Sequence, residues 1–584
     1  VNEFFNVFDD RIPLRVPHME KPNITFPKLL MEKAATYQSR VAMREKEFGV
    51  WRPITWAQYF ENVKHLALGL IKLGLKKGDK VSIIGDNRPR LYWGMTAAQA
   101  LGAIPVPLYQ DAVAEEMAYV LDHCGARFVI CGDQEQVDKV IEVQDQLHQF
   151  EHLIYLDPRG LRKYDHSHLH DYRHVQDQGR AARDEFTNEL KARREKLTYD
   201  STCVMLYTSG TTGPPKGALH AQRVLLGHLP GVEFPHNLFP KEDDLFWTPA
   251  DWAWIGGLID VLFPSWHHGI PVVAHRARKF DPEEAFRLIA GYGIRNAFMP
   301  PTALKLMRQV KDPKSRHSYR MRSIGSGGET LGEELLDWGR DVMGLTINEF
   351  YGQTECNLIV GCCADVMEIR AGSMGRAIPG HTVDVIDEEG NTVAPGTVGE
   401  IAVKRPDPVM FLEYWRKPEA TRKKYIGDWL LTGDLARKDE DGYFWFHGRT
   451  DDVITSAGYR IGPAEIEDCL MKHPAVALVG VIGVPDPVRG EIVKAFILPK
   501  EGVRPDEALE ESIRDHVKTK LEAHAYPREV VFLEKMPQTN TGKILKNELR
   551  RMHEKGLLGS GFKGSGFRDS RKPGTQNAEP MNTK

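Results

Sequence analysis

Apolar and polar positions in the first third of the chain alternate between two spacings. Residues 56–75 carry apolar side chains at the spacing of one helix face, whereas residues 80–84 form a short apolar run of strand length. The alternation continues with helices expected over residues 91–103 and 115–124 and strands over residues 104–108 and 127–131. Helices that alternate with strands in this way predict an α/β fold whose strands run largely parallel.

The pattern changes after Gly448. Residues 464–473 have helical spacing, and in residues 508–523 the apolar side chains recur every four residues, at Leu509, Ile513, Val517 and Leu521. Strands are expected over residues 476–484, 494–499 and 529–533. The sequence therefore predicts a large layered α/β domain with mixed or parallel sheets, followed by a small α+β domain of about a hundred residues.

Two polar stretches depart from these patterns. Residues 176–196 are rich in Arg, Glu and Ala, which predicts a solvated surface helix or an excursion from the fold. Residues 553–584 are polar and Gly-rich, and GSGFK at 559–563 is followed by GSGFR at 564–568. Such a segment buries too little apolar area to offset the entropy of ordering, so we expect a flexible tail. A basic segment that binds a partner is the alternative.

Length and composition narrow the class of protein. A chain of 584 residues is long enough for more than one domain, and 41% hydrophobic with 27% charged residues is ordinary globular composition. The net charge of −4 gives no reason to expect nucleic-acid or anionic-membrane binding. No stretch reaches the roughly 18 apolar residues of a spanning helix. The nearest candidate, residues 255–266, is interrupted by Asp260 and Pro264.

The cysteines and the first residues of the chain indicate the cellular compartment in which the protein is expected. The seven cysteines include no CxxC pair, so neither a disulfide framework nor a structural zinc site is expected. Cys362 and Cys363 are adjacent and are expected to be packing residues. The first residues lack the basic start and apolar core of a secretory signal. We therefore expect a reducing, cytoplasmic compartment, while the oligomeric state stays open.

Residues 208–217, TSGTTGPPKG, form the segment with the clearest chemistry. They follow an apolar strand expected over residues 203–207. Glycines permit tight turns, hydroxyl and backbone N–H groups can surround phosphate oxygens, and Lys216 adds a positive charge. The segment is not a Walker A loop, because Pro215 and Gly217 flank the lysine where that motif needs Gly and Ser or Thr.

This loop resembles the phosphate-binding signature of the adenylate-forming superfamily, which includes acyl-CoA synthetases, peptide-synthetase adenylation domains and luciferases. Further segments match in the family's order: residues 325–329 (GSGGE), 351–355 (YGQTE), 431–434 (LTGD), 448–452 (GRTDD) and 537–543 (PQTNTGK). The resemblance spans roughly residues 25–552 and favours the acetyl and medium-chain branch of AMP-dependent acyl-CoA synthetases. It implies an adenylation domain over residues 1–448 and a small mobile domain over residues 449–552.

The resemblance implies that ATP activates a carboxylic acid as an acyl-adenylate with release of pyrophosphate, before coenzyme A replaces AMP. Lys543, Thr211 and Glu355 are the expected catalytic residues, with Glu355 as the Mg²⁺ ligand because a carboxylate is a hard oxygen donor. The expected ATP and AMP contacts are Thr208, Ser209, Gly210, Thr211, Thr212, Gly213, Lys216, Gly328, Glu329, Thr330, Glu349, Phe350, Tyr351, Gly352, Gln353, Thr354, Asp434, Arg449, Arg460 and Lys543. Within this set, the Tyr351 ring is expected to stack on adenine and Asp434 to accept the ribose hydroxyls.

A second set of residues is implied for transfer to coenzyme A. Asp451 resembles the family hinge, about which the small domain reorients between the two half-reactions. The expected coenzyme A contacts are Ala457, Gly458, Tyr459, Arg489, Tyr526 and Arg528.

The acyl group is the least determined part of this interpretation. Acetyl-CoA synthetases commonly have Trp where this chain has Gly352, so the missing indole is expected to leave room for a medium-chain, branched or aromatic acid. Trp254, Gly256 and Gly352 are the expected acyl pocket, although core packing would explain Trp254 and Gly256 equally well. A ligase that loads an acyl carrier protein is the alternative function.

Overall fold

The structure is a computed structural model that describes residues 24–47, 49–208, 214–275, 279–450, 452, 454–456, 459–487, 489–521, 525–538 and 544–556. The chain divides into two compact units. The large unit comprises Val1–Asp452 with Gln538–Lys543, and the small unit comprises Val453–Pro537 with Ile544–Lys584.

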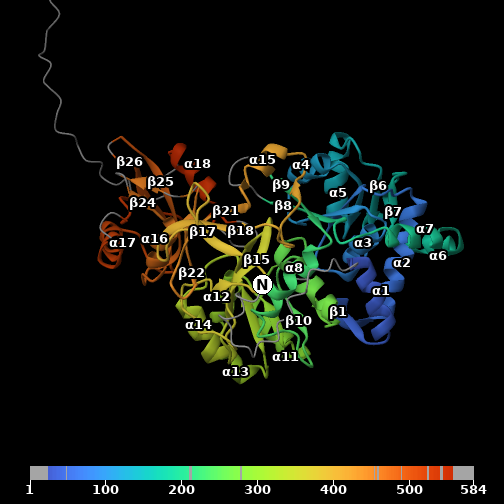
Figure 1. Ribbon diagram of the computed structural model, residues 1–584, viewed down its shortest axis with the longest axis horizontal. Helices are drawn as coiled ribbons and strands as arrows, with labels where there is room; N and C mark the ends of the chain where they lie inside the picture. The colour runs from blue at the N-terminus through green and yellow to red at the C-terminus, as the bar shows by residue number, and fades with distance from the viewer. Residues whose placement is uncertain are drawn as a thin grey trace, which may run out of the picture. The chain divides into compact units, whose positions relative to one another are not determined.

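A five-stranded parallel sheet in the large unit confirms the predicted alternation (Figure 1). In sheet order its strands are β4 (Ile104–Leu108), β3 (Lys80–Ile84), β5 (Ala126–Cys131), β6 (His152–Tyr155) and β7 (Leu169–Asp171). The accompanying helices are α2 (Trp56–Lys72), α3 (Pro89–Ala100), α4 (Ala114–Cys124) and α5 (Gln134–Val143). Helix α2 begins with a capping box in which Thr55 and Gln58 satisfy each other's backbone N–H groups.

The charged stretch at residues 176–196 forms two helices rather than one, α6 (Tyr172–Ala181) and α7 (Arg183–Glu195). Both pack on α2, and Figure 1 shows them on the outer side of α2 and α3. Gly179 lies so close to the His65 carbonyl of α2 that a Cβ there would stand 2.0 Å from the oxygen. The stretch is thus a packed part of the fold, with one face against α2.

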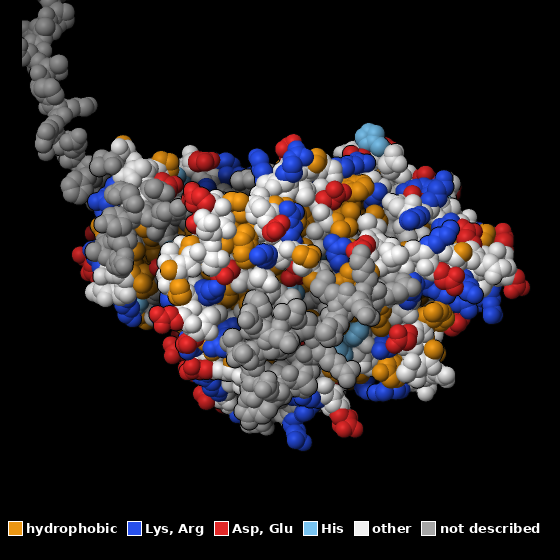
Figure 2. All heavy atoms as spheres, in the orientation of Figure 1, with side chains coloured by type: hydrophobic (Ala, Val, Ile, Leu, Met, Phe, Trp, Pro, Cys, Tyr) orange, Lys and Arg blue, Asp and Glu red, His pale blue; other side chains and the backbone are white. Residues whose placement is uncertain are grey.

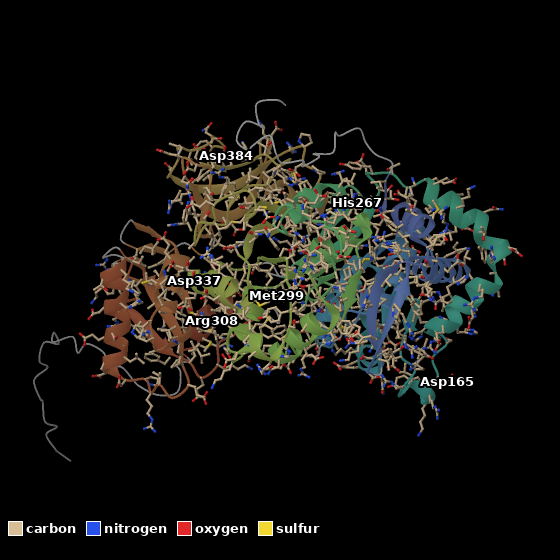
Figure 3. The ribbon with its side chains drawn as sticks, turned by 90° about the horizontal axis from the view of Figure 1, so that it is seen from below. Asp165, His267, Met299, Arg308, Asp337 and Asp384 are labelled. Atoms are coloured by element: carbon tan, nitrogen blue, oxygen red, sulfur yellow. The ribbon has the colours of Figure 1, made fainter. Side chains whose placement is uncertain are left out.

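A nine-stranded mixed sheet forms the centre of the large unit. In sheet order its strands are β16 (Arg376–Ala377), β15 (Cys356–Gly361), β14 (Asn348–Gln353), β13 (Ser323–Ser326), β12 (Asn296–Phe298), β10 (Phe246–Trp247), β11 (Val272–Ala274), β1 (Val41–Glu47) and β2 (Val50–Thr55). Strands β14 to β1 of this order are parallel, whereas β15, β16 and β2 are antiparallel edges. Met299, directly after β12, is fully buried among the strands, whereas Asp165 lies at the periphery (Figure 3).

Two smaller sheets complete the large unit. One is the antiparallel sheet β19 (Glu413–Tyr414), β9 (Lys216–Ala221) and β8 (Thr202–Thr208). The other contains β17 (Val383–Ile386), β18 (Val398–Lys404), β21 (Trp429–Lys438), β20 (Tyr425–Ile426) and β22 (Phe444–Arg449). The remaining helices are α1 (Phe26–Tyr37), α8 (Val224–Glu233), α9 (Ile255–Gly257), a π-helix (Leu258–Leu262), α10 (Phe263–His268), α11 (Pro282–Tyr292), α12 (Pro301–Arg308), α13 (Pro313–Arg316), α14 (Glu333–Trp338), a second π-helix (Gly339–Met343), α15 (Pro418–Arg422) and short 3₁₀ turns at Gln144–Gln146 and Leu161–Lys163.

The small unit has the predicted α+β composition. Its sheet contains β24 (Tyr459–Ile461), β23 (Ile454–Ser456), β26 (Gly490–Pro499), β25 (Val476–Asp486) and β27 (Glu529–Phe532), and its helices are α16 (Pro463–Met471), α17 (Glu507–Lys520) and α18 (Lys546–Glu554). Ile513 and Val517 of α17 are fully buried, and Leu509 and Leu521 pack against the same cluster. Helix α18 continues through Glu554, past residue 553 where the tail is predicted to start. Residues 557–584 lie outside the described residues.

The charge distribution and the cysteines can be compared with what the composition predicts. Charged side chains of both signs are spread over the face shown in Figure 2. All seven cysteines are free and buried, and Cys363 packs with Phe234 and Ile378 as expected of a small packing residue. Within the described ranges, no helix combines the length and the apolar character needed to cross a bilayer.

Buried histidines predict acid sensitivity. Burial lowers the pKa of His220 to about 4 and of His228 and His236 to about 3, so these rings are neutral in the folded state. In the unfolded chain a histidine titrates near pH 6.5. Stability is therefore fully present above about pH 6.5 and falls below it, by roughly 2 kcal/mol per ring between pH 7 and pH 5. Calorimetry should show a falling Tm over this range, and His228→Gln should flatten the slope; equal slopes in both proteins would contradict the assignment.

Candidate active site

The ends of the glycine-rich loop are anchored in one small sheet. Thr208, the last residue of β8, lies directly opposite Lys216, the first residue of β9. The Tyr119 hydroxyl donates to the Pro215 carbonyl at 3.1 Å. The two predicted phosphate-binding residues Thr208 and Lys216 are thus brought side by side at the mouth of the loop.

Glu355 lies beside this sheet and is held by Tyr414. The Tyr414 hydroxyl donates a hydrogen bond to Glu355 Oε1, and the Phe411 N–H donates to the Glu355 carbonyl at 2.9 Å. Only 8% of Glu355 is exposed. Tyr414 belongs to β19, which pairs with β9, and the Lys216 ammonium lies 5.2 Å from the centre of its ring. The structure therefore places the predicted cation ligand next to the base of the loop.

The glycine segment and the predicted adenine contacts lie at neighbouring strand ends. Strands β13 and β14 are parallel and pair Ser326 with Glu349, so both carboxyl ends open on the same edge. Gly328 has φ +98°, which favours glycine, and Glu329 forms an ion pair with Lys305 at 3.7 Å. Glu349 is buried and accepts from the Leu331 N–H at 3.2 Å. Through this bond Glu349 fixes the segment that contains Glu329 and Thr330.

Asp434 is the centre of a polar network. It accepts hydrogen bonds at Oδ2 from the Tyr351 hydroxyl (2.6 Å) and from Gln353 Nε2, and Arg449 Nη1 lies 3.3 Å from Oδ1. Asp434 on β21 is paired with Arg449 on β22 in the strand register. Burial and the adjacent carboxylate of Asp434 raise the pKa of Tyr351, so its hydroxyl stays a donor. Four predicted nucleotide-binding residues are thereby brought into contact.

Aromatic rings line the glycine segment on its apolar side. The rings of Trp254 and Phe298 are 5.6 Å apart, and those of Phe298 and Phe350 are 5.3 Å apart. A Cβ on Gly256 would meet the Trp254 ring at 2.6 Å and the Phe298 ring at 2.7 Å, so a glycine is needed there. Phe350, an expected nucleotide contact, is 5% exposed and its ring packs in the core, so its backbone is the part left for such a contact.

Gly352 departs from the sequence expectation. A Cβ on Gly352 would stand 2.2 Å from the Leu358 backbone nitrogen and 2.7 Å from the Asn357 Cα. The β14–β15 hairpin, which has an irregular register between Tyr351 and Gln353, closes over this position. The side of Gly352 that a Cβ would occupy is therefore filled by backbone, and no room for an acyl chain opens on that side. Thr354 lies in the turn of the same hairpin.

In the small unit, Tyr526 carries a basic cluster. The Arg528 guanidinium lies 4.8 Å and the Lys518 ammonium 4.9 Å from the centre of the Tyr526 ring. Arg489 lies in the turn between β25 and β26, where its N–H donates to Asp486 at 2.8 Å. Of the three expected coenzyme A contacts, Tyr526 and Arg528 lie together, whereas Arg489 belongs to a separate turn.

Several predicted residues lie outside the described residues: Ser209, Gly210, Thr211, Thr212, Gly213, Asp451, Ala457, Gly458 and Lys543. The side chains of Tyr459 and Arg460 also lie outside them.

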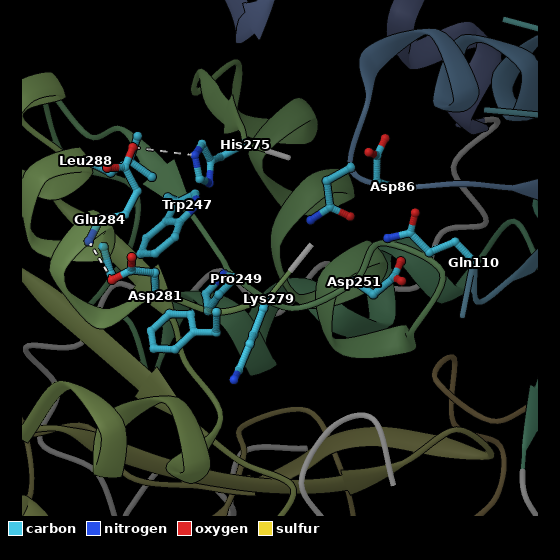
Figure 4. A pocket seen from close by; sticks show the side chains of 13 residues that line it. Asp86, Gln110, Trp247, Pro249, Asp251, His275, Lys279, Asp281, Glu284 and Leu288 are labelled. Atoms are coloured by element: carbon cyan, nitrogen blue, oxygen red, sulfur yellow. Dashed lines mark hydrogen bonds and ion pairs between the residues drawn. The ribbon is translucent and has the colours of Figure 1, made fainter. Parts of the chain in front are cut away.

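A pocket of about 360 Å³ opens at strand ends of the five-stranded parallel sheet and the nine-stranded mixed sheet (Figure 4). Its lining follows the carboxyl ends of β3, β4, β10 and β11, where α/β folds usually bind ligands. Figure 4 shows Asp86, Gln110 and Asp251 on one side of it and His275 and Glu284 on the other. Burial and the charges of Asp111 and Asp86 raise the pKa of Asp251 to about 7. The pocket has a mixed polar and apolar lining that includes none of the predicted nucleotide residues.

Sequence reasoning missed Tyr414 and this pocket. Tyr414 occurs in an unremarkable stretch, and its contact with Glu355 joins residues 59 positions apart. The sequence does contain a signal for the pocket, because Asp86, Gln110 and Asp251 each follow an apolar strand pattern by two to four residues.

The polar groups present fit a divalent cation at Glu355. Its Oε1 accepts from Tyr414, and within the described ranges no residue donates to Oε2. A buried carboxylate with one oxygen left for a ligand is the hard donor that Mg²⁺ prefers.

Comparisons with known proteins assign both parts of the chain. Residues 30–415 match the family model described as AMP-binding enzyme, and residues 465–543 match the AMP-binding enzyme C-terminal domain. Acetyl-coenzyme A synthetase of Bacillus subtilis is 35% identical over 82% of this chain and 81% of its own length. The human mitochondrial acyl-coenzyme A synthetase ACSM4 is 34% identical over 82% of this chain and 80% of its own length.

Solved structures agree with the fold. The anthranilate CoA ligase AuaEII, in complex with anthranoyl-AMP, superposes with a TM-score of 0.79 at 26% identity and covers 92% of this chain and 98% of its own. The acyl-CoA synthetase of Brucella canis has a TM-score of 0.66 at 28% identity, with 92% and 96% covered.

Gly352 offers a direct test of the closed hairpin. Gly352→Ala should lower Tm and reduce the activation of short and long acids in parallel, because the new Cβ must displace backbone at a cost of about 1–3 kcal/mol. The control is Gly332→Ala, which places a Cβ where no atom lies within 4 Å. ATP–pyrophosphate exchange with propionate and octanoate measures the effect. Selective loss of octanoate activation with an unchanged Tm would restore Gly352 as a chain-length gate.

Proposed function

The chain belongs to the AMP-binding enzyme family and is an AMP-forming acyl-coenzyme A synthetase, and on that premise we propose that its acid is apolar: medium-chain, branched or aromatic. The observation that carries this proposal is the row of rings formed by Trp254, Phe298 and Phe350 along the glycine segment. Phe298 and Phe350 are buried behind the half-buried Trp254, so an apolar acyl group would gain about 25 cal/mol for each Å² of apolar surface buried against the Trp254 ring.

Further support comes from the partial exposure of Trp254. This residue is half-buried, unlike Phe298 and Phe350, and its ring stands 3.7 Å from the position of a Cβ on Gly328. Trp254 therefore presents an apolar face next to a predicted nucleotide residue, where the acyl carbons of an acyl-adenylate would have to lie. Relatives include enzymes named for acetyl-CoA synthesis and for anthranilate activation, so the family accommodates acids of different size.

We assign the first half-reaction to the large unit and Lys543. Thr208 and Lys216 at the loop base would hold the phosphates of ATP, and Tyr351, Asp434 and Arg449 would position the adenosine. Glu355 would hold Mg²⁺, which when bound neutralises charge on the phosphate oxygens. Lys543 would meet the negative charge that builds between the carboxylate and the α-phosphate.

We assign the second half-reaction to coenzyme A and the small unit. Residues 449–552 would act as the mobile domain that turns about Asp451, and the Ala457–Arg460 loop would approach the acyl-adenylate. The basic cluster of Arg528 and Lys518 around Tyr526 suits the phosphates of coenzyme A, because cations in a fixed arrangement bind anions.

The alternative, a ligase that loads an acyl carrier protein, shares the first half-reaction. The two are separated by supplying octanoate, ATP and free coenzyme A and measuring octanoyl-CoA. Formation of acyl-CoA at a rate close to that of adenylation supports the proposal. Adenylation without acyl-CoA, rescued by an acyl carrier protein, would favour the alternative.

Trp254 tests the acyl wall. Trp254→Ala removes the indole beside Phe298, so kcat/KM for a branched or aromatic acid should fall relative to propionate by about tenfold, the order of a one-methylene change in an apolar pocket. Trp445→Ala, which removes a partly buried indole bonded to Asp439, is the matched control. A panel that changes in parallel for all acids would place the acyl group elsewhere.

Lys543 tests the division of the half-reactions. Lys543→Ala should reduce acyl-adenylate formation by about two to three orders of magnitude, as expected when one preorganised charge is lost from a transition state. Thioester formation from supplied acyl-AMP and coenzyme A should be spared. Equal losses in both half-reactions, or none, would overturn the assignment.

A further inference from the structure

We propose that Tyr414 is a positioning residue for the acid-activation step, because its hydroxyl fixes one oxygen of Glu355 and leaves the other for the divalent cation. The inference rests on the proposed role of Glu355 as the cation ligand.

The contact between the two side chains has a defined direction. A carboxylate oxygen can only accept, so the Tyr414 hydroxyl is the donor of the bond to Glu355 Oε1. Elsewhere in the described part of the chain no group donates to Oε2. A carboxylate bonded through one oxygen keeps its plane and its second oxygen in one orientation.

Tyr414 is itself held rigidly. It is 4% exposed, its N–H donates to Thr421 Oγ1 at 2.9 Å, and its ring lies 4.9 Å from that of Phe411. Strand pairing sets Tyr414 opposite Ala218 of β9. Because the Phe411 N–H also binds the Glu355 carbonyl, the segment 411–414 holds Glu355 by both its backbone and its side chain.

This arrangement links the cation ligand to the glycine-rich loop. Strand β9 begins with Lys216, whose ammonium lies over the Tyr414 ring at 5.2 Å from its centre, so Tyr414 contacts a cation through its ring and a carboxylate through its hydroxyl. Without the hydroxyl, Glu355 would be free to turn toward Lys216, and the pair would neutralise the two charges that the phosphates and the metal need. Tyr414 therefore acts through Glu355 rather than on the substrate.

The test is Tyr414→Phe in the full chain, which keeps the ring and removes only the donor. Mn²⁺ binding in the presence of a non-hydrolysable ATP analogue, followed by electron paramagnetic resonance, should weaken about tenfold, the lower end for loss of a group that orients a metal ligand. The Mg²⁺ concentration for half-maximal adenylation should rise similarly, while thioester formation from supplied acyl-AMP stays unchanged. Tyr443→Phe is the control, since that buried hydroxyl donates to the Glu368 carbonyl at 2.8 Å.

Glu355→Gln separates a failure of the positioning role of Tyr414 from a failure of the role proposed for Glu355. If Glu355→Gln weakens Mn²⁺ binding but Tyr414→Phe binds like wild type, the positioning role is wrong and the role of Glu355 stands. If neither variant changes Mn²⁺ binding, the role proposed for Glu355 fails as well. If Tyr443→Phe weakens Mn²⁺ binding as much as Tyr414→Phe, the effect is general loosening and the positioning role is overturned.

Discussion

A carboxylate buried from water must be compensated by hydrogen bonds, and the candidate site is built around two such carboxylates. Glu355 and Asp434, 8% and 5% exposed, each accept a bond from a tyrosine hydroxyl, Tyr414 and Tyr351 respectively. Tyr414 is buried and Tyr351 is partly buried, and β19, which carries Tyr414, pairs with β9, a strand remote in sequence. The charges that a nucleotide and a cation require are therefore held in place by the sheets rather than by the loops that carry the motifs.

Two glycines determine how closely side chains and backbone pack near this site. Gly256 lets the rings of Trp254 and Phe298 approach, and Gly352 lets the β14–β15 hairpin close on its own backbone. Gly352 was expected to border open space for the acyl group, and Gly256 was expected either in the wall of the acyl pocket or in core packing. In the fold both glycines are tightly packed. The apolar wall consists of the Trp254 and Phe298 rings, which pack closely because residue 256 has no side chain. This shifts the question of acid specificity from a missing indole at residue 352 to the indole that is present at Trp254.

The pocket of Figure 4 follows from the same architecture. It lies where carboxyl ends of strands from two sheets converge, so its lining comes from four separate stretches of sequence. Asp251 combines burial with neighbouring carboxylates, which brings its pKa near neutrality, a property common among functional groups in clefts. The large unit thus has a pocket of mixed polar and apolar lining in addition to the residues gathered around Glu355 and Asp434.

The sequence by itself determined whatever depends on local periodicity and on spacing within a motif. The strands β3 and β4, the α+β order of the small unit and the family were all readable, because helix and strand repeats and a ten-residue loop are written in adjacent positions. Tertiary structure decided the rest. The stretch 176–196 became two helices packed on α2, Phe350 turned into the core, and Gly352 was enclosed by Leu358 and Asn357. The bond from Tyr414 to Glu355 spans 59 residues and depends on β19 pairing with β9. Such strand pairings depend on the packing of whole sheets, and the local pattern of polar and apolar residues does not predict them.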